Sequence, residues 1–150
     1  MEIHRLQFSI DVKAEKSRIW NALWEDSAYR AWAGVFSEGA YAVSDNWKVG
    51  STVMFLGPDQ SGIYSIIENH IPNKHIQFKH IGNVLKGEHQ APDEESKKWS
   101  GATESYSLIE GEESIKLLVE IDIMEEHLDF METRFPKALE KIKNRALEQL

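Results

Sequence analysis

Residues 8–32, FSIDVKAEKSRIWNALWEDSAYRAW, lead from an alternating strand into an aromatic-rich helix and then a short second helix. The strand shows a period of two, because apolar and polar residues alternate from residue 5 to residue 12. That period is typical of a strand with one buried face. The apolar positions are Leu6, Phe8, Ile10 and Val12. This order of elements already limits the folds that the chain can adopt.

From Glu15 the spacing of apolar residues becomes helical. Ile19 and Leu23 lie four residues apart. Trp20 and Trp24 have the same spacing, so the two pairs occupy neighbouring stripes of a helix. We expect Trp20 and Leu23 to anchor this helix on the core, because bulky apolar side chains on adjacent stripes can pack together against a sheet.

Six further stretches have the composition of strands and are separated by turn residues such as Pro72-Asn73-Lys74. The intervals between them are too short for crossover helices, so consecutive antiparallel strands are favoured over a parallel sheet. The stretches are residues 39–43, 51–55, 62–71, 75–81, 100–111 and 113–123.

From about His127 the period predicts one long amphipathic helix that continues to Leu150. Pro136 lies inside this pattern and lacks the N–H that would reach the carbonyl of Glu132. We therefore expect the helix to kink or to restart at this proline. The repeating apolar positions are Leu128, Met131, Phe135, Leu139, Ile142, Ala146 and Leu150.

The segment from Gly82 to Trp99 is long, polar and without a clear period. Loops of this length are uncommon in compact domains and tend to be lids, binding loops or disordered insertions. Disorder or a plain solvated loop is the favoured interpretation. A functional lid is the alternative, because Trp99, Val84 and Leu85 could pack over the mouth of a cavity.

Composition limits the classes of partner. A chain of 150 residues fits one domain, residues 1–150, with a sizeable core. The formal net charge of -8 disfavours nucleic acid and anionic membranes as partners, since affinity for phosphates comes mostly from lysine and arginine. No apolar run is long enough to span a bilayer.

The same sequence predicts a cytoplasmic location. Its first residues, MEIHRLQ, do not form a basic region followed by an apolar one, so we expect no secretory signal. The chain has no cysteine, which excludes disulfides and thiolate chemistry and fits a reducing compartment.

The histidines do not have the spacing of a metal site. His70, His75 and His80 are five residues apart along predicted strands, so successive members point to opposite faces. No serine lies in a motif that would activate it as a nucleophile, and no phosphate-binding loop is present. We therefore predict no metal and no cofactor.

Acid and base groups on the inward faces of strands remain as candidates for chemistry. By strand parity, His80 shares a face with Phe78, and Glu104 shares one with Tyr106. If these faces point inward, the three polar side chains can bind or protonate a ligand carbonyl or hydroxyl. The alternative is that each is a hydrogen-bonded structural residue near the rim of the sheet.

Four stretches together resemble the SRPBCC superfamily, which includes START domains and the birch-pollen allergens. The last of them resembles the branch related to the activator of the ninety-kilodalton heat-shock ATPase. The resemblance implies an α+β helix-grip fold, in which a curved antiparallel sheet of six or seven strands wraps around the C-terminal helix and often encloses a cavity. The stretches are AEKSRIWNALWEDSAYRAW (14–32), WKVGSTVMF (47–55), GIYSIIENHIPNKHIQF (62–78) and RFPKALEKIK (134–143).

Strand parity and the bulky positions at the start of the C-terminal helix, together with this architecture, predict an apolar pocket between the sheet and the helix. The helix residues could instead simply fill the core. The predicted ligand-binding residues are Phe78, His80, Glu104, Tyr106, Phe130, Met131 and Phe135.

Three functions are compatible with such a fold. The leading prediction is a binding protein for a small hydrophobic or amphipathic ligand, namely a lipid, an isoprenoid or an aromatic compound. The second is an enzyme of the cyclase, aromatase or hydrolase kind that uses the same cavity. The third is a chaperone-linked interaction protein with a protein partner, as the activator branch implies. The sequence does not specify the oligomeric state.

Overall fold

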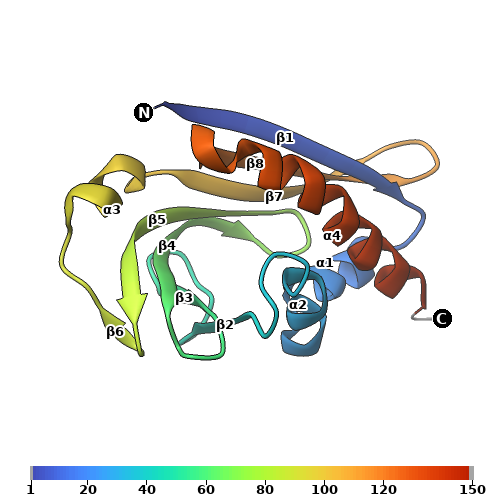
Figure 1. Cartoon of the computed structure of the whole chain (residues 1–150). Helices are drawn as coiled ribbons and strands as arrows, with labels where there is room; N and C mark the ends of the chain where they lie inside the picture. The colour runs from blue at the N-terminus through green and yellow to red at the C-terminus, as the bar shows by residue number, and fades with distance from the viewer. Residues whose placement is uncertain (1, 149–150) are drawn as a thin grey trace.

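The computed structural model describes residues 2–148 and forms one curved antiparallel sheet around a long helix (Figure 1). The strands follow the order β1-β8-β7-β5-β4-β3-β2, with the short β6 paired to β5. The predicted α+β helix-grip fold is confirmed, with eight strands in place of the expected six or seven. The strands are β1 (Ile3–Val12), β2 (Tyr41–Ser44), β3 (Thr52–Leu56), β4 (Gly62–Ile71), β5 (His75–Leu85), β6 (Glu88–His89), β7 (Thr103–Glu110) and β8 (Ile115–Met124).

Helices cover the concave side of this sheet. Two short helices follow β1, as predicted, and α4 contacts β1, α1 and α2. In Figure 1, α4 runs beside β1 and ends close to α1. None of the helices within residues 2–148 is long and apolar enough to cross a membrane. The helices are α1 (Lys16–Trp24), α2 (Asp26–Ala33), α3 (Glu94–Trp99) and α4 (Leu128–Glu148), with a 3-10 turn η1 (Glu125–His127) before α4.

The alternation in β1 decides which of its side chains meet the helix. Strand β1 pairs antiparallel with β8, and Phe8 lies opposite Val119. Because every second residue of β1 points inward, Phe8 reaches α4 and stacks on Phe135 with ring centroids 4.8 Å apart. The polar residues of the other parity are exposed on the outer side, namely Arg5, Gln7, Ser9 and Asp11.

The first helix is anchored as the sequence predicts. Trp20 and Leu23 are both buried in the core. Helix α2 is fixed to α1 by the Trp32 indole, whose Nε1 donates a hydrogen bond of 2.9 Å to the carbonyl oxygen of Leu23. This contact explains why two short helices can pack as one unit under the sheet.

Helix α4 includes Pro136 in its interior and does not restart there. The alternative, a kink at this proline, stays a prediction. The helix begins at Leu128, one residue after the expected start, because η1 forms the preceding turn. Its expected continuation to Leu150 lies outside the described residues.

The segment from Gly82 to Trp99 is neither disordered nor a plain loop, so the favoured interpretation was wrong. Strand β5 continues to Leu85, β6 pairs with it, and α3 follows. Helix α3 begins with a capping box: the Asp93 carboxylate accepts from Ser96 N at 2.7 Å, and Ser96 Oγ accepts from Asp93 N at 3.0 Å. The sequence Asp93-Glu-Glu-Ser-Lys-Lys carried this signal, with acids in the first turn and bases in the last.

Candidate ligand-binding site

A cavity of about 430 Å³ lies between the sheet and the helices. It is bordered by α2, α3, the first half of α4 and strands β3, β4, β5, β7 and β8. Its volume falls in the range of roughly 300 to 1,000 Å³ that is usual for small-molecule sites. Apolar side chains make up most of its wall. Seven of them are aromatic, namely Tyr29, Trp32, Phe36, Phe55, Trp99, Tyr106 and Phe135.

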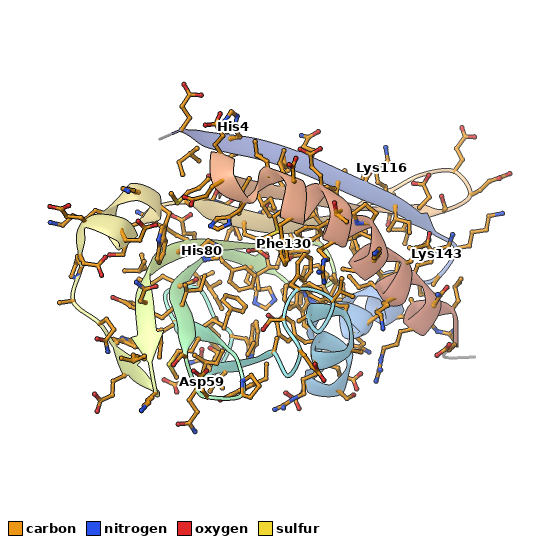
Figure 2. The ribbon with its side chains drawn as sticks, in the orientation of Figure 1. His4, Asp59, His80, Lys116, Phe130 and Lys143 are labelled. Carbon is orange, nitrogen blue, oxygen red and sulfur yellow. The ribbon has the colours of Figure 1, made fainter. Side chains whose placement is uncertain are left out.

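Five of the seven predicted site residues line this cavity: His80, Glu104, Tyr106, Met131 and Phe135. Figure 2 labels His80 on β5 and Phe130 on α4. Phe130 does not line the cavity and is 41 % exposed. Phe130 and Phe135 are five positions apart, which turns the two side chains to different faces of a helix with 3.6 residues per turn.

Phe78 also does not line the cavity, although its strand parity was read correctly. Its side chain is fully buried on the concave face of β5. The rings of Phe55 and Trp24 pack on it, with centroids 5.2 Å and 5.5 Å away. Phe78 is therefore a core residue beneath the cavity wall, and only the packing of other elements could show this.

The polar side chains at the cavity form one hydrogen-bonded chain across three neighbouring strands. His80 Nε2 lies 3.1 Å from Glu104 Oε1, and the Tyr106 hydroxyl donates to Glu104 Oε2. On the other side, His80 Nδ1 lies 2.6 Å from Ser65 Oγ. The strand register causes this proximity, because Ser65 pairs with His80 between β4 and β5, and Phe78 pairs with Glu104 between β5 and β7.

Ser65 was missed in the sequence, and its place decides its role. A serine hydrogen-bonded to a histidine, which is in turn hydrogen-bonded to a glutamate, resembles the triad of a nucleophilic enzyme. However, Ser65 is fully buried and does not line the cavity, so its hydroxyl has no access to a ligand there. Ser65 instead holds the His80 ring in place. Parity could have placed Ser65 on the inward face with Ile67, but the register with β5 was needed to bring it to His80.

The network keeps Glu104 ionised and Tyr106 neutral. Burial pushes the pKa of the Glu104 carboxyl up, but the hydrogen bond and charge of His80 and the hydrogen bond from Tyr106 outweigh it, so this pKa lies below its usual value. Burial, and then the neighbouring Glu104 charge, hold the pKa of Tyr106 well above its usual value. At neutral pH the cavity therefore presents a carboxylate that accepts hydrogen bonds.

The lowered pKa of Glu104 makes the fold sensitive to acid. Because this pKa is lower in the folded than in the unfolded state, the stabilisation is complete above the unfolded value of about 4.3 and is lost as the pH falls through the folded value. We expect Glu104→Gln to reduce the loss of unfolding free energy between neutral pH and pH of about 3. Urea unfolding at a series of pH values measures this.

The control is Glu112→Gln, an exposed position in the β7–β8 turn. It should leave the pH dependence unchanged. Asp122, whose pKa is also lowered against the effect of burial by Arg5 and Thr103, contributes with the same sign, so the Glu104 variant should keep part of the acid sensitivity. Identical pH profiles for the wild type and Glu104→Gln would contradict the role of the Glu104 network.

Helix α3 brings Trp99 and Glu95 to the cavity from the segment whose structure the sequence left open. Of the other two residues considered for a lid, Val84 is buried without lining the cavity and Leu85 is 54 % exposed. Trp99 is thus the one member of that group that forms part of the cavity wall.

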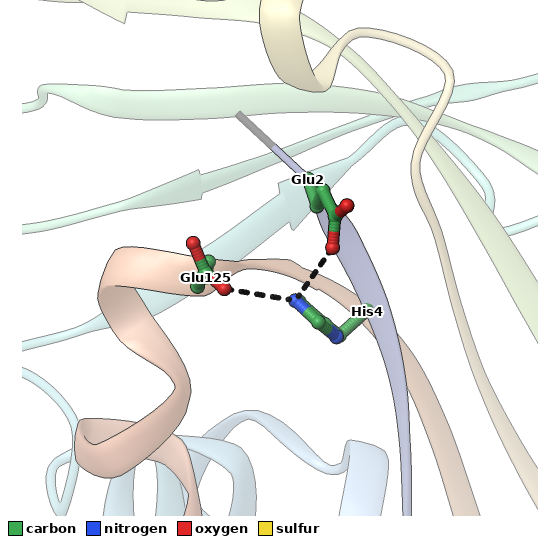
Figure 3. A group of neighbouring side chains, drawn as sticks. All are labelled: Glu2, His4 and Glu125. Carbon is green, nitrogen blue, oxygen red and sulfur yellow. Dashed lines mark ion pairs between the residues drawn. The ribbon is translucent and has the colours of Figure 1, made fainter.

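A second cluster of titratable groups lies where β1 and η1 meet (Figure 3). His4 Nε2 is 3.6 Å from Glu125 Oε1 and 3.8 Å from Glu2 Oε2. The two carboxylates are mostly exposed, and pairs of this kind contribute only about 0 to 1 kcal/mol. We interpret the cluster as a surface ion-pair group. The absence of a metal stays a prediction.

Comparison with known proteins supports the fold. No protein-family model matches the chain, and no curated protein does. Among solved structures, the Aha1 dimer from Colwellia psychrerythraea is 21 % identical, with a TM-score of 0.64 over 94 % of each chain. A protein from Arthrobacter aurescens is also 21 % identical, with a TM-score of 0.64 over 96 % of this chain and 86 % of that one.

A third solved structure is also similar to this chain. DynU16, from the dynemicin biosynthetic locus, is 10 % identical, with a TM-score of 0.65 over 97 % of this chain and 47 % of that chain. At these identities the likenesses concern the fold alone. They support the helix-grip fold of the chain.

Proposed function

We propose that this protein binds a small hydrophobic or amphipathic ligand, such as a lipid, an isoprenoid or an aromatic compound, in the cavity between the sheet and α4. The observation that carries the proposal is the cavity itself, about 430 Å³ in volume and walled mainly by apolar side chains, many of them aromatic. A few convergent polar groups within an apolar wall are the usual composition of a site for small molecules. The superfamily resemblance of the sequence agrees with this role.

For Glu104 and Tyr106, hydrogen bonding to a ligand is favoured over proton exchange with it. A general base or acid is most effective when its pKa lies near the working pH. The pKa of Glu104 is shifted down and that of Tyr106 is shifted up, so each moves away from neutrality. Because the hydroxyl proton of Tyr106 is already donated to Glu104, the pair is suited to accept hydrogen bonds from a ligand rather than to exchange protons with it.

The role of a chaperone-linked interaction protein, with a place in the activator branch, rests on the sequence resemblance. The likeness to the Aha1 structure, at 21 % identity, supports the shared fold and adds nothing on partners. The cavity gives the ligand-binding proposal a structural basis that the interaction proposal lacks.

Calorimetric titration with an isoprenoid alcohol, a long-chain alcohol and a naphthalene derivative tests the proposal. Ala40 lines the cavity, and we expect Ala40→Leu to weaken binding about 5- to 150-fold, because overfilling a packed site costs about 1 to 3 kcal/mol. Ala91→Leu is the matched control at an exposed position away from the cavity. Failure of all three probes to bind the wild type would refute the proposed function. Equal weakening of binding by both variants would show that the ligand does not bind in this cavity.

A further inference from the structure

The permanent charges on the cavity wall have one sign. Three carboxylates line it, those of Glu95, Glu104 and Asp122. Among the described residues that form its wall there is no lysine or arginine, and the only basic groups are the imidazoles of His80 and His127. A ligand that enters this space meets carboxylates without a permanent cation beside them on the wall.

The three carboxylates differ in how far neighbouring cations and hydrogen-bond donors already balance their charge. Asp122 accepts from Arg5 Nε at 2.8 Å and from Thr103 N at 2.9 Å, so its charge is balanced from outside the cavity. Glu95 lies on the exposed surface of α3, 3.4 Å from Lys98 Nζ. We therefore expect Asp122 and Glu95 to have only weak electrostatic interactions with a ligand in the cavity.

Glu104 is the carboxylate that a ligand would meet inside. Its side chain is 26 % exposed and lies on β7 between His80 and Tyr106. These partners supply two hydrogen bonds, one to each oxygen, whereas an ionised carboxylate can accept about four. Even with a protonated His80, the pair has no surplus positive charge, because Glu104 already balances it.

We propose that the cavity selects ligands whose polar end donates a hydrogen bond, a hydroxyl or a protonated amine, and excludes ligands that end in a carboxylate. This inference rests on the proposed function and specifies its ligand class. A ligand hydroxyl or ammonium group can donate to the free lone pairs of Glu104 while the apolar body lies along the aromatic wall. A ligand carboxylate would be buried beside a like charge without a counter-ion, which is strongly unfavourable.

Three probes with one apolar body test the selectivity: 2-naphthylmethanol, 2-naphthylmethylamine and 2-naphthoate, titrated calorimetrically into the wild-type protein at neutral pH. We expect the alcohol and the amine to bind at least about tenfold more tightly than the carboxylate, since hydrogen bonds to charged groups are among the stronger ones. This comparison needs no variant, so it stands even if a substitution at Glu104 prevents folding.

Glu104→Gln then assigns the selectivity to one side chain. It keeps the size of the residue and removes its charge, so the preference for the amine over the carboxylate should shrink by about tenfold or more. Glu94→Gln is the matched control, an exposed glutamate of α3 that does not line the cavity, and it should keep the wild-type preference.

The outcomes separate this inference from the proposed function. A carboxylate probe that binds as tightly as the alcohol would overturn the inference and leave the proposed function standing. Unchanged selectivity in a folded Glu104→Gln variant would also overturn it. If none of the three naphthyl probes binds, the inference fails. The proposed function fails with it only when the isoprenoid alcohol and the long-chain alcohol also do not bind.

Discussion

Replacing Trp20 by alanine is expected to lower the free energy of unfolding by about 3 to 5 kcal/mol. The Trp20 side chain is only 7 % exposed in the core. Its ring packs edge-on to Trp24 at 6.3 Å and stacks on His70 at 6.2 Å, so truncation removes contacts on two sides and leaves a large void. Urea denaturation followed by far-ultraviolet circular dichroism measures the loss.

The matched control is Trp99→Ala on α3. Trp99 is partly exposed at the cavity wall, so truncation of its ring should cost clearly less than truncation of Trp20. A loss below about 1 kcal/mol for Trp20→Ala would contradict the anchoring role of the first helix. The result bears on function because α1 supports α2, which supplies one wall of the cavity.

Phe135→Ala is the second substitution with a large expected effect, a loss of about 3 to 5 kcal/mol in unfolding free energy. The Phe135 ring is 3 % exposed, stacks on Phe8 at 4.8 Å and meets Phe36 edge-on at the same distance. It therefore joins β1, the segment after α2, and α4. Chemical denaturation of the variant and the wild type measures the difference.

Phe130→Ala is the control on the same helix. Phe130 is 41 % exposed and does not line the cavity, so its truncation should cost less than about 1 kcal/mol. Equal losses for the two variants would contradict the difference between the two faces of α4. Because Phe135 carries so much of the fold, its removal is a poor test of ligand binding, and the filling variant at Ala40 is better suited.

The proposed ligand class follows from two features of the cavity wall, its aromatic rings and the Glu104 carboxylate. Aromatic rings make the cavity favourable to an apolar body, whereas Glu104 makes one end of it polar and negative. The carboxylate stays ionised because His80 and Tyr106 offset its burial. Shape alone would accept a fatty acid as readily as a fatty alcohol, and we expect the charge of Glu104 to distinguish the two.

Local periodicity was sufficient for the elements and for much of the site. A period of two predicts which strand residues share a face, so His80, Glu104 and Tyr106 could be assigned to inward faces from the sequence. A period of 3.6 predicted α4 and the anchoring positions Trp20 and Leu23. These patterns depend on neighbours in the chain, which is why one sequence suffices to recognise them.

Tertiary structure decided the remainder, because it depends on residues that are distant in sequence. Strand register brought Ser65 to His80, and the packing of Trp24 and Phe55 removed Phe78 from the cavity wall. The direction in which α4 faces the sheet separated Phe135 from Phe130. Periodicity determines which side chains share a face, but only the pairing and packing of distant elements determine what that face meets.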